Sequence, residues 1–345
     1  MEISNIILMV LVTFLFVLFF IPVVKEIALH VGALDIPNER KVHKKPIPRL
    51  GGLGIYCGFL IGYVIFGHPS IQMNSILIGS FIIVITGIID DIKPIKARYK
   101  LMGQVIGASV VPLFGGIVLK DISAFGLYVN FGVFSYPITI LFIVSIINSL
   151  NLIDGLDGLA GGIASIYFLM IGIISIILNN SSGLDTILTF IMLGCTLGFL
   201  VHNFYPATIF MGDSGSMFLG YIIAVISLLG YKNVTFTSLI VPIFLLAIPI
   251  VDTALAIIRR LIKHESIATP DKNHLHHRLL RFSMSVRKTV LIIYFIDILF
   301  AIASLIYVTN NRVSGIIIYV VILILVLLLL YKVNNIYKKN EGGKR

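Results

Sequence analysis

The feature that most limits how this chain can fold is a succession of apolar stretches, each about as long as a bilayer-spanning helix. Such a helix needs about 20 mainly apolar residues. Eleven stretches meet this requirement, and we expect each to be a membrane-spanning helix. They are 3–29, 49–67, 73–90, 99–118, 133–150, 158–178, 184–203, 214–230, 237–259, 288–309 and 313–333. The chain is 58% hydrophobic and 12% charged, whereas soluble domains carry about 25% charged residues. The sequence therefore predicts an all-α polytopic membrane protein.

Basic residues are unequally shared between the two sides that these spans define. Lys25 and the segments 31–49, 91–100, 259–288 and 332–345 hold 23 of the 26 Lys and Arg residues. Cytoplasmic loops of membrane proteins carry an excess of such residues. We therefore expect the N-terminus outside and the C-terminus in the cytoplasm. The formal net charge of +10 then follows from topology, and we expect no nucleic-acid partner.

The chain 1–345 is expected to form a single integral membrane domain, with 260–287 as a cytoplasmic loop rich in His and Arg. Among the outer connections, only 119–132 is long enough for structure of its own. Its pieces VLKDIS and LYVNFG predict a small extracytoplasmic β-hairpin. No internal repeat is visible in the sequence, which gives no support to an inverted-repeat transporter.

The segment Asn148–Ala160, NSLNLIDGLDGLA, places four polar side chains at the end of an apolar run. They are Asn148, Asn151, Asp154 and Asp157, each three residues after the one before. At helical spacing such side chains stay on one side of a helix, and Gly155 and Gly158 loosen the backbone around the last of them. Polar groups are costly in a membrane segment and mark functional sites. We therefore expect this segment to form part of a site.

Two adjacent carboxylates, Asp90 and Asp91, end the third apolar run and open the basic segment DDIKPIKARYK. Acidic groups at the C-terminal end of a helix oppose its dipole, so helix stabilisation explains them poorly. Such a pair suits metal binding or proton acceptance. The structural alternative is a helix end whose charges neutralise one another.

Another carboxylate, Asp213, opens the eighth apolar run within FMGDSGS. One reading is that Asp213 only caps the helix. A helix N-terminus with small residues is also an anion site, and a carboxylate there can hold Mg²⁺ against a phosphate. The sequence therefore marks Asp213 as a candidate metal ligand.

Two cytoplasmic segments combine histidine with basic residues. The first, DIPNERKVHKKPIPRLGG, includes His43 and Lys45, and is either an ordinary loop on lipid headgroups or a clamp on an anionic substrate. The second, DKNHLHHRLLRF, has four residues of interest. They are His274, His276, His277 and Arg278. A zinc site would need further ligands and no partner cysteines exist, so contacts with phosphate or sugar hydroxyls fit better.

Asp252 lies inside the apolar run 237–259, where an acid is costly unless it is paired. Structural pairing and substrate binding are equally good explanations for it, whereas Asp297 is expected to be structural. Acids that suit Mg²⁺ and bases that suit phosphate gather on one expected membrane face, which indicates phosphoryl transfer. The chain has no P-loop, so ATP hydrolysis is not indicated. A site at the membrane surface suggests one lipid-borne and one soluble substrate.

Four of these motifs, in this order and with eleven expected spans, resemble one known family. They are DDIKP, NSLNLIDGLDGLA, FMGDSGS and DKNHLHHRLL. The sequence is similar over nearly its whole length to the polyprenyl-phosphate N-acetylhexosamine-1-phosphate transferases. The resemblance implies transfer of GlcNAc-1-phosphate from UDP-GlcNAc to undecaprenyl phosphate, with release of UMP and with Mg²⁺ or Mn²⁺ as cofactor. It looks closest to enzymes that start teichoic acid, O-antigen or related envelope glycans. The sister phospho-MurNAc-pentapeptide transferases carry a different last motif and rank second.

The resemblance also implies roles for individual residues. It makes Asp90, Asp91 and Asp154 catalytic, with one of the first two as the base for the lipid phosphate. It makes Asp213 and Asp154 metal ligands. The residues implied to bind substrates are Asn148, Asn151, Asp157, Lys100, His43, Lys45, His274, His276, His277 and Arg278. Among these, Lys100 would hold phosphate and Asp157 would lie at the nucleoside pocket.

The implied reaction leaves its number of steps open. Direct attack of the lipid phosphate on the β-phosphorus of UDP-GlcNAc would invert that phosphorus, whereas a covalent aspartyl-phosphate would give net retention. The expected partners are a UDP-sugar, undecaprenyl phosphate, membrane lipids and a second copy of the chain in a homodimer. The expected location is the bacterial cytoplasmic membrane, with the active site facing the cytoplasm.

Two rival classes make different predictions. A proton-coupled transporter predicts acids near the bilayer midplane, whereas most acids here lie at the expected cytoplasmic ends of spans. A lipid-binding scaffold without catalytic activity would release no UMP from any UDP-sugar.

Overall fold

A computed structural model describes most of the chain. The described residues are 2–37, 45–124, 127–178, 183–232, 239–264, 274–280, 284–309 and 312–342. Backbone contacts divide the chain into two compact units, Met1–Leu239 and Ile240–Arg345, and each is described by itself. The expectation of one membrane domain over 1–345 stays a prediction.

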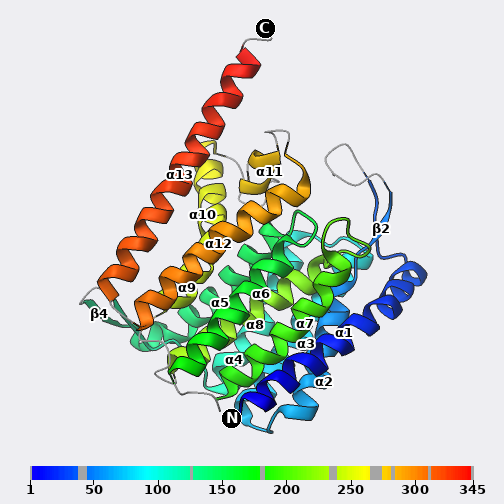
Figure 1. Ribbon diagram of the computed structural model, residues 1–345. Coiled ribbons are helices and arrows are strands. Elements are labelled where there is room, and N and C mark those ends of the chain that lie inside the picture. Colours follow the sequence, from blue (N-terminus) through cyan, green and yellow to red (C-terminus); the bar gives the residue numbers. More distant parts are fainter. Residues whose placement is uncertain are drawn as a thin grey trace. The chain divides into compact units, whose positions relative to one another are not determined.

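The first unit is a helical bundle whose central member is α8 (Figure 1). Its helices are α1 (Ile3–Val31), α2 (Gly51–Phe66), α3 (Ile71–Ile92), α4 (Ala97–Gly115), α5 (Ser135–Ile153), α6 (Leu159–Ile177), α7 (Leu184–Asn203) and α8 (Gly212–Lys232). Helix α8 packs against α2, α3, α5, α6 and α7, and its buried residues include Phe218 and Tyr221. A helix that is apolar around its circumference suits such an enclosed position.

Glycines let the first turn of α8 approach two neighbouring helices closely. A Cβ atom added at Gly52 of α2 would lie 2.0 Å from the Gly215 nitrogen, and one at Gly87 of α3 would lie 2.4 Å from the Ser214 Cα. Both distances are far below a van der Waals contact. Any larger residue at Gly52 or Gly87 would therefore push the start of α8 away from α2 and α3.

Two short strand pairs lie in the first unit. Strand β1 (Leu34–Asp35) pairs antiparallel with β2 (Ile47–Pro48). Strand β3 (Asp121–Ala124) pairs antiparallel with β4 (Leu127–Asn130), and the 3-10 helix η1 (Gly132–Phe134) follows. The second pair lies within 119–132, where the sequence predicts a hairpin. Its extracytoplasmic location stays a prediction.

The second unit is built around α12. Its helices are α9 (Ile240–Leu245), α10 (Ala247–Ile262), α11 (Leu275–Leu280), α12 (Val286–Thr309) and α13 (Arg312–Gly342). Helix α12 packs against α9, α10, α11 and α13.

One expected span of this unit is not a single continuous helix. The run 237–259 was expected to be one helix, but it is interrupted at Leu246, between α9 and α10. Pro249 explains the interruption, because a proline has no N–H and its ring clashes with the carbonyl four residues earlier. That carbonyl belongs to Leu245, the last residue of α9.

Eight helical segments in the described part of the chain are long and apolar enough to cross a membrane. They are Ile3–Val31, Ile71–Ile92, Gly132–Ile153, Leu159–Ile177, Leu184–Asn203, Gly212–Gly230, Val286–Thr309 and Arg312–Leu329. Helix α2 is apolar but has only 16 residues, and the first turn of α4 carries Arg98 and Lys100. The class of all-α polytopic membrane protein is thereby confirmed. The count of eleven spans and their orientation stay predictions.

Candidate active site

The end of α3 is bound to the beginning of α8 through the Asp91 carboxylate. Its two oxygens accept hydrogen bonds from the Asp213 N–H at 2.8 Å, the Ser214 N–H at 3.0 Å and the Ser214 hydroxyl at 2.7 Å. The first N–H groups of a helix have no partner within it, so Asp91 acts as a cap supplied by another helix. Its side chain has no exposed surface.

Arg49 binds the last carbonyl groups of α3. Its guanidinium donates to the Asp90 carbonyl at 2.8 Å and to the Asp91 carbonyl at 3.1 Å. The same group lies 3.7 Å from the Asp91 carboxylate and 3.8 Å from that of Asp35. A cation at the C-terminal end of a helix offsets the negative end of its dipole. Arg49 therefore explains how two acids are tolerated at this helix end, and sequence analysis did not single it out.

The chain around Arg49 is also joined to the segment before α8. The Phe210 N–H donates to the Pro48 carbonyl at 2.7 Å, and the Gly51 N–H donates to the Phe210 carbonyl at 2.9 Å. Lys45 lies exposed just before this junction, and His43 lies outside the described residues. These backbone bonds hold Arg49 beside α3 and α8 at once.

Lys100 of α4 connects the remaining two carboxylates. Its ammonium group is hydrogen-bonded to Asp213 and lies 3.7 Å from the Asp90 carboxylate. Asp90 also accepts a hydrogen bond from the Ile95 N–H at 2.8 Å. The side chain of Asp213 is 25% exposed and that of Asp90 is 12% exposed. Of the acids that meet Lys100, Asp213 is therefore accessible and Asp90 is partly so, whereas Asp91 is fully enclosed.

Helix α5 contributes Asn151 to the same cluster. Its amide nitrogen donates to the Asp213 carboxylate at 2.9 Å and to the Ser216 hydroxyl at 2.8 Å. Asn148 lies one turn earlier and donates to the Gln104 side-chain carbonyl at 2.8 Å. The expectation that Asn148 and Asn151 share a helix face thus agrees with their common location in α5.

The other two members of that motif lie beyond the helix, which corrects the expectation of one helical face. Helix α5 ends at Ile153, and Asp154 is its C-terminal cap residue with ψ 59°. Gly158 has φ +79°, a backbone conformation that favours glycine, and α6 begins directly after it. Asp157 lies in the intervening turn, where its carboxylate accepts a hydrogen bond from the Ala207 N–H at 2.9 Å.

A buried amide holds this turn in place. Asn203, the last residue of α7, accepts a hydrogen bond from the Gly158 N–H at 3.0 Å and donates to the Ile209 carbonyl at 2.9 Å. Asn203 was not among the predicted site residues, because a lone amide in an apolar run carries no spacing signal.

Asp154 has an unusual electrostatic environment. Burial, followed by the charges of Asp213, Asp91 and Asp157, raises the pKa of Asp154 to about 8. Among the described residues it has no hydrogen-bond partner. A carboxylate in this state holds a proton near neutral pH and gives it up when a cation binds beside it.

The acids of this cluster are of the type that binds a magnesium ion together with other oxygen ligands. Mg²⁺ is commonly held by one or two carboxylates while substrate phosphates and water supply the other oxygens. Asp213 and Asp154 are such carboxylates, and the Lys100 ammonium meets the negative charge of Asp213 in this structure. No group of three His, Cys, Asp or Glu residues within the described part of the chain could hold a metal alone.

The histidine motif belongs to the second unit, where it gathers around Asp252 of α10. The His274 ring nitrogen Nδ1 lies 2.8 Å from the Asp252 carboxylate, and the Leu275 N–H donates to its other oxygen at 2.9 Å. Asp252 is therefore paired rather than free. The ring centroids of His276 and His277 are 4.3 Å apart, and Arg278 follows them on α11.

His276 is neutral at physiological pH. Burial, followed by the neighbouring His277, lowers the pKa of His276 to about 3. Its Nδ1 atom is buried with no hydrogen-bond partner among the described residues. A neutral imidazole has one donor and one acceptor nitrogen, so His276 suits a sugar hydroxyl or amide better than it suits a phosphate.

The first unit thus brings acids, a lysine and an amide together at the start of one helix. The family model for glycosyl transferase family 4 matches residues 73–231, which include Asp90, Asp91, Asp154 and Asp213. The chain is 41% identical over 300 residues to a protein of Bacillus subtilis named probable undecaprenyl-phosphate N-acetylglucosaminyl 1-phosphate transferase. The match covers 86% of this chain and 83% of that protein.

Two further relatives carry similar names. A decaprenyl-phosphate N-acetylglucosaminephosphotransferase of Mycolicibacterium smegmatis is 34% identical over 79% of this chain and 74% of its own length. An undecaprenyl-phosphate alpha-N-acetylglucosaminyl 1-phosphate transferase of Yersinia pestis is 28% identical over 88% of this chain and 84% of its own length. The protein is therefore a multi-pass membrane transferase. It belongs to glycosyl transferase family 4, in agreement with the resemblance seen in its motifs.

Proposed function

We propose that this transferase moves GlcNAc-1-phosphate from UDP-GlcNAc to undecaprenyl phosphate and releases UMP. The observation that carries the proposal is the junction at the start of α8, where Asp213 is bonded to Lys100 and Asn151 with Asp90 beside them. This junction offers acids for a divalent cation and an ammonium for a phosphate, which are the groups that phosphoryl transfer needs. The names of the relatives supply the sugar and the lipid.

We assign different tasks to the two adjacent aspartates. Asp91 has both oxygens bonded to the first turn of α8, so it positions Asp213 and takes no part in proton transfer. Asp90 is partly exposed and lies next to Lys100, so it is the base that keeps the acceptor phosphate deprotonated. Sequence reasoning left this choice between the two acids open.

Asp213 and Asp154 would hold Mg²⁺, with Mn²⁺ as a substitute. When bound, the cation would neutralise charge on the donor diphosphate. Lys100 would exchange its contact with Asp213 for one with a phosphate oxygen as substrates arrive. Asp157 and Asn151 would hold the donor, and a lipid phosphate oxygen would then form a bond to the β-phosphorus as the bond to UMP breaks. Inversion at that phosphorus would support one step, and net retention would support two.

The remaining sites are assigned by motif. His43 and Lys45 would steer the lipid phosphate, and His276, His277 and Arg278 would recognise the sugar and the diphosphate. Asn148, paired with Gln104, would keep α5 and α4 in register beneath the site. We place the active site on the cytoplasmic face of a bacterial plasma membrane, because the basic residues gather there in the expected topology.

The experiment that tests this function is a UMP-release assay. The purified protein in detergent receives undecaprenyl phosphate, Mg²⁺ and, in separate reactions, UDP-GlcNAc, UDP-GalNAc, UDP-glucose or UDP-MurNAc-pentapeptide. We expect UMP from UDP-GlcNAc and a lipid product that carries GlcNAc. Release only from UDP-MurNAc-pentapeptide would move the protein to the peptidoglycan branch. No UMP from any donor would overturn the proposed function.

A further inference from the structure

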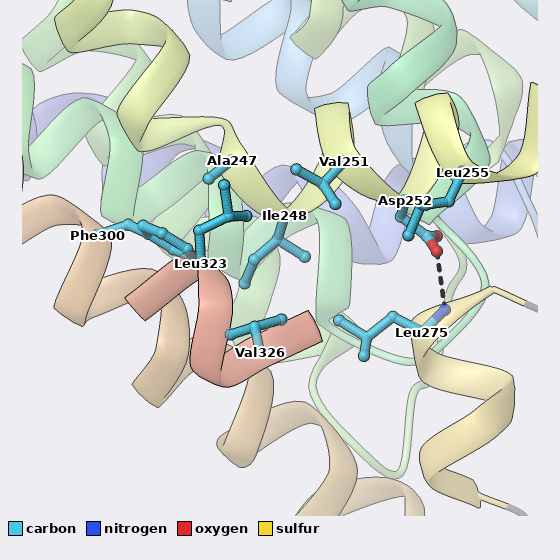
Figure 2. A pocket seen from close by; sticks show the side chains of 9 residues that line it. All are labelled: Ala247, Ile248, Val251, Asp252, Leu255, Leu275, Phe300, Leu323 and Val326. Carbon is cyan, nitrogen blue, oxygen red and sulfur yellow. Dashed lines mark hydrogen bonds between the residues drawn. The ribbon is translucent and has the colours of Figure 1, made fainter. Parts of the chain in front are cut away.

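The second unit holds a buried acid, Asp252, that has no role in the proposed function. Asp252 lies on α10, is 6% exposed, and is the one charged residue among the described residues that line a pocket in this unit. The other lining side chains are apolar and come from α10, α11, α12 and α13. Figure 2 shows the Asp252 carboxylate turned from this wall toward the start of α11.

Both oxygens of Asp252 are used in holding α11. One accepts a hydrogen bond from the Leu275 N–H at 2.9 Å and the other lies 2.8 Å from Nδ1 of His274. The Leu275 side chain also lines the pocket (Figure 2). The first residue of α11 is thus held by a charge-assisted hydrogen bond and by apolar contact. A carboxylate so engaged is not a substrate ligand.

The contact with Asp252 determines which ring nitrogen of His274 carries the proton. An ionised carboxylate can only accept a hydrogen bond, so Nδ1 of His274 carries the proton. The rings of His274 and His276 are nearly parallel, with an interplanar angle of 3° and centroids 5.8 Å apart. His276 in turn lies against His277, and the Arg278 N–H donates to the His274 carbonyl at 3.0 Å. The orientation of His274 therefore affects the residues that follow it.

We propose that Asp252 is a positioning residue that anchors α11 through His274 and Leu275 and so sets the arrangement of His276, His277 and Arg278. The consequence for activity rests on the proposed function, in which these three residues recognise the donor. His274 is then an anchor of the motif and does not contact the substrate. Loss of the anchor weakens donor binding and leaves the chemistry at Asp213 intact.

The test compares Asp252→Asn, His274→Ala and the double variant in the UMP-release assay. Asparagine can still accept from the Leu275 N–H, but its amide presents a donor toward His274 and reverses the ring tautomer. We expect the KM for UDP-GlcNAc to rise about tenfold and kcat to change by less than about threefold. A tenfold loss is at the lower end of the range for residues that orient a ligating histidine through its other ring nitrogen. Because asparagine keeps the bond from the Leu275 N–H and changes only the contact with His274, the double variant should be no worse than His274→Ala.

Asp297→Asn is the matched control. Asp297 is 1% exposed in α12 and has no hydrogen-bond partner among the described residues, so this change should leave both constants as in wild type. Additive losses in the double variant, or a fall in kcat at unchanged KM, would overturn the proposal.

A second readout does not depend on activity. Hydrogen exchange at 275–280 should accelerate at least tenfold in Asp252→Ala while exchange in α12 is unchanged. Unchanged protection of α11 would overturn the anchoring role. If the wild type releases no UMP from any donor, the proposed function fails while hydrogen exchange still decides the anchor.

Discussion

Two aspartates, one in each unit, show how differently a carboxylate on a helix can be used: Asp213 lies in the first turn of α8, and Asp252 lies inside α10. The side chain of Asp213 is 25% exposed and its partners are the ammonium of Lys100 and the amide of Asn151. The side chain of Asp252 is 7% exposed and its partners are an imidazole and a backbone N–H. A mobile ammonium can be exchanged for a cation or a phosphate, whereas a backbone N–H cannot. Accessible acids with mobile partners indicate chemistry, and enclosed acids with fixed partners indicate architecture.

The same contrast separates two neighbours in the chain. The Asp90 side chain is 12% exposed and lies beside Lys100, in addition to its bond from the Ile95 N–H, whereas the Asp91 side chain has no exposed surface and is held by the first turn of α8. The comparison therefore predicts that substitutions at accessible acids reduce turnover, while those at enclosed acids reduce stability or donor affinity.

The largest effect is expected for Asp213→Ala. Removing the carboxylate takes away several kcal/mol of cation-mediated charge stabilisation, which corresponds to about a 10³-fold loss in kcat. Excess Mg²⁺ should restore little of it, because the ligand itself is missing. UMP release measured across a Mg²⁺ titration checks this, and activity near wild type would remove Asp213 from the site.

Asp90→Asn and Asp91→Asn should fail in different ways. Loss of a general base costs about 10²-fold or more in kcat, so Asp90→Asn should lose turnover while its thermal unfolding is unchanged. Asp91→Asn keeps one accepting oxygen but turns an amide donor toward the donors of the first turn of α8, so it should cost about 1 kcal/mol of stability or more, with a smaller loss of turnover. Thermal melting curves and kcat values measured for both variants test this difference. Equal loss of turnover at unchanged stability in both variants would contradict the assignment.

Arg49→Lys should lower kcat about tenfold. A lysine keeps the charge but cannot donate to the Asp90 and Asp91 carbonyls together, since it lacks the planar fork of arginine. The KM for UDP-GlcNAc should change little, because Arg49 acts on the aspartates and not on the donor. Lys120→Ala is the control for an exposed basic residue outside this junction, and it should leave kcat unchanged.

The smallest effect concerns pH. The pKa of Asp154 is raised to about 8, so protons compete with Mg²⁺ below that value, and apparent Mg²⁺ affinity should increase as pH rises. A single competing proton predicts about a fivefold gain between pH 7 and pH 8. Kinetic Mg²⁺ titrations at the two values check this, and Asp154→Asn should abolish the difference. A wild-type affinity that does not vary with pH would rule out Asp154 as a ligand.

The helical class could be predicted because apolar length in a membrane is a local property that each run of residues carries by itself. The break at Leu246 escaped prediction because Pro249 acts on a carbonyl one turn earlier. The candidate cluster of Asp90, Asp154 and Asp213 was predicted from polar residues at run ends. Two sets of contacts could not be predicted. Arg49 lies 41 and 42 positions from the aspartates whose carbonyls it binds, and Asp252 lies 22 positions from His274. No local sequence pattern specifies such pairings.

The central claim is that Asp213 holds a divalent cation together with the donor diphosphate. Electron paramagnetic resonance of protein-bound Mn²⁺, with UDP-GlcNAc present, measures this directly through the hyperfine coupling between manganese and phosphorus-31. We predict a coupling in the wild type and in Asp252→Asn at saturating donor, and its loss in Asp213→Asn. A coupling that persists unchanged in Asp213→Asn would contradict the account.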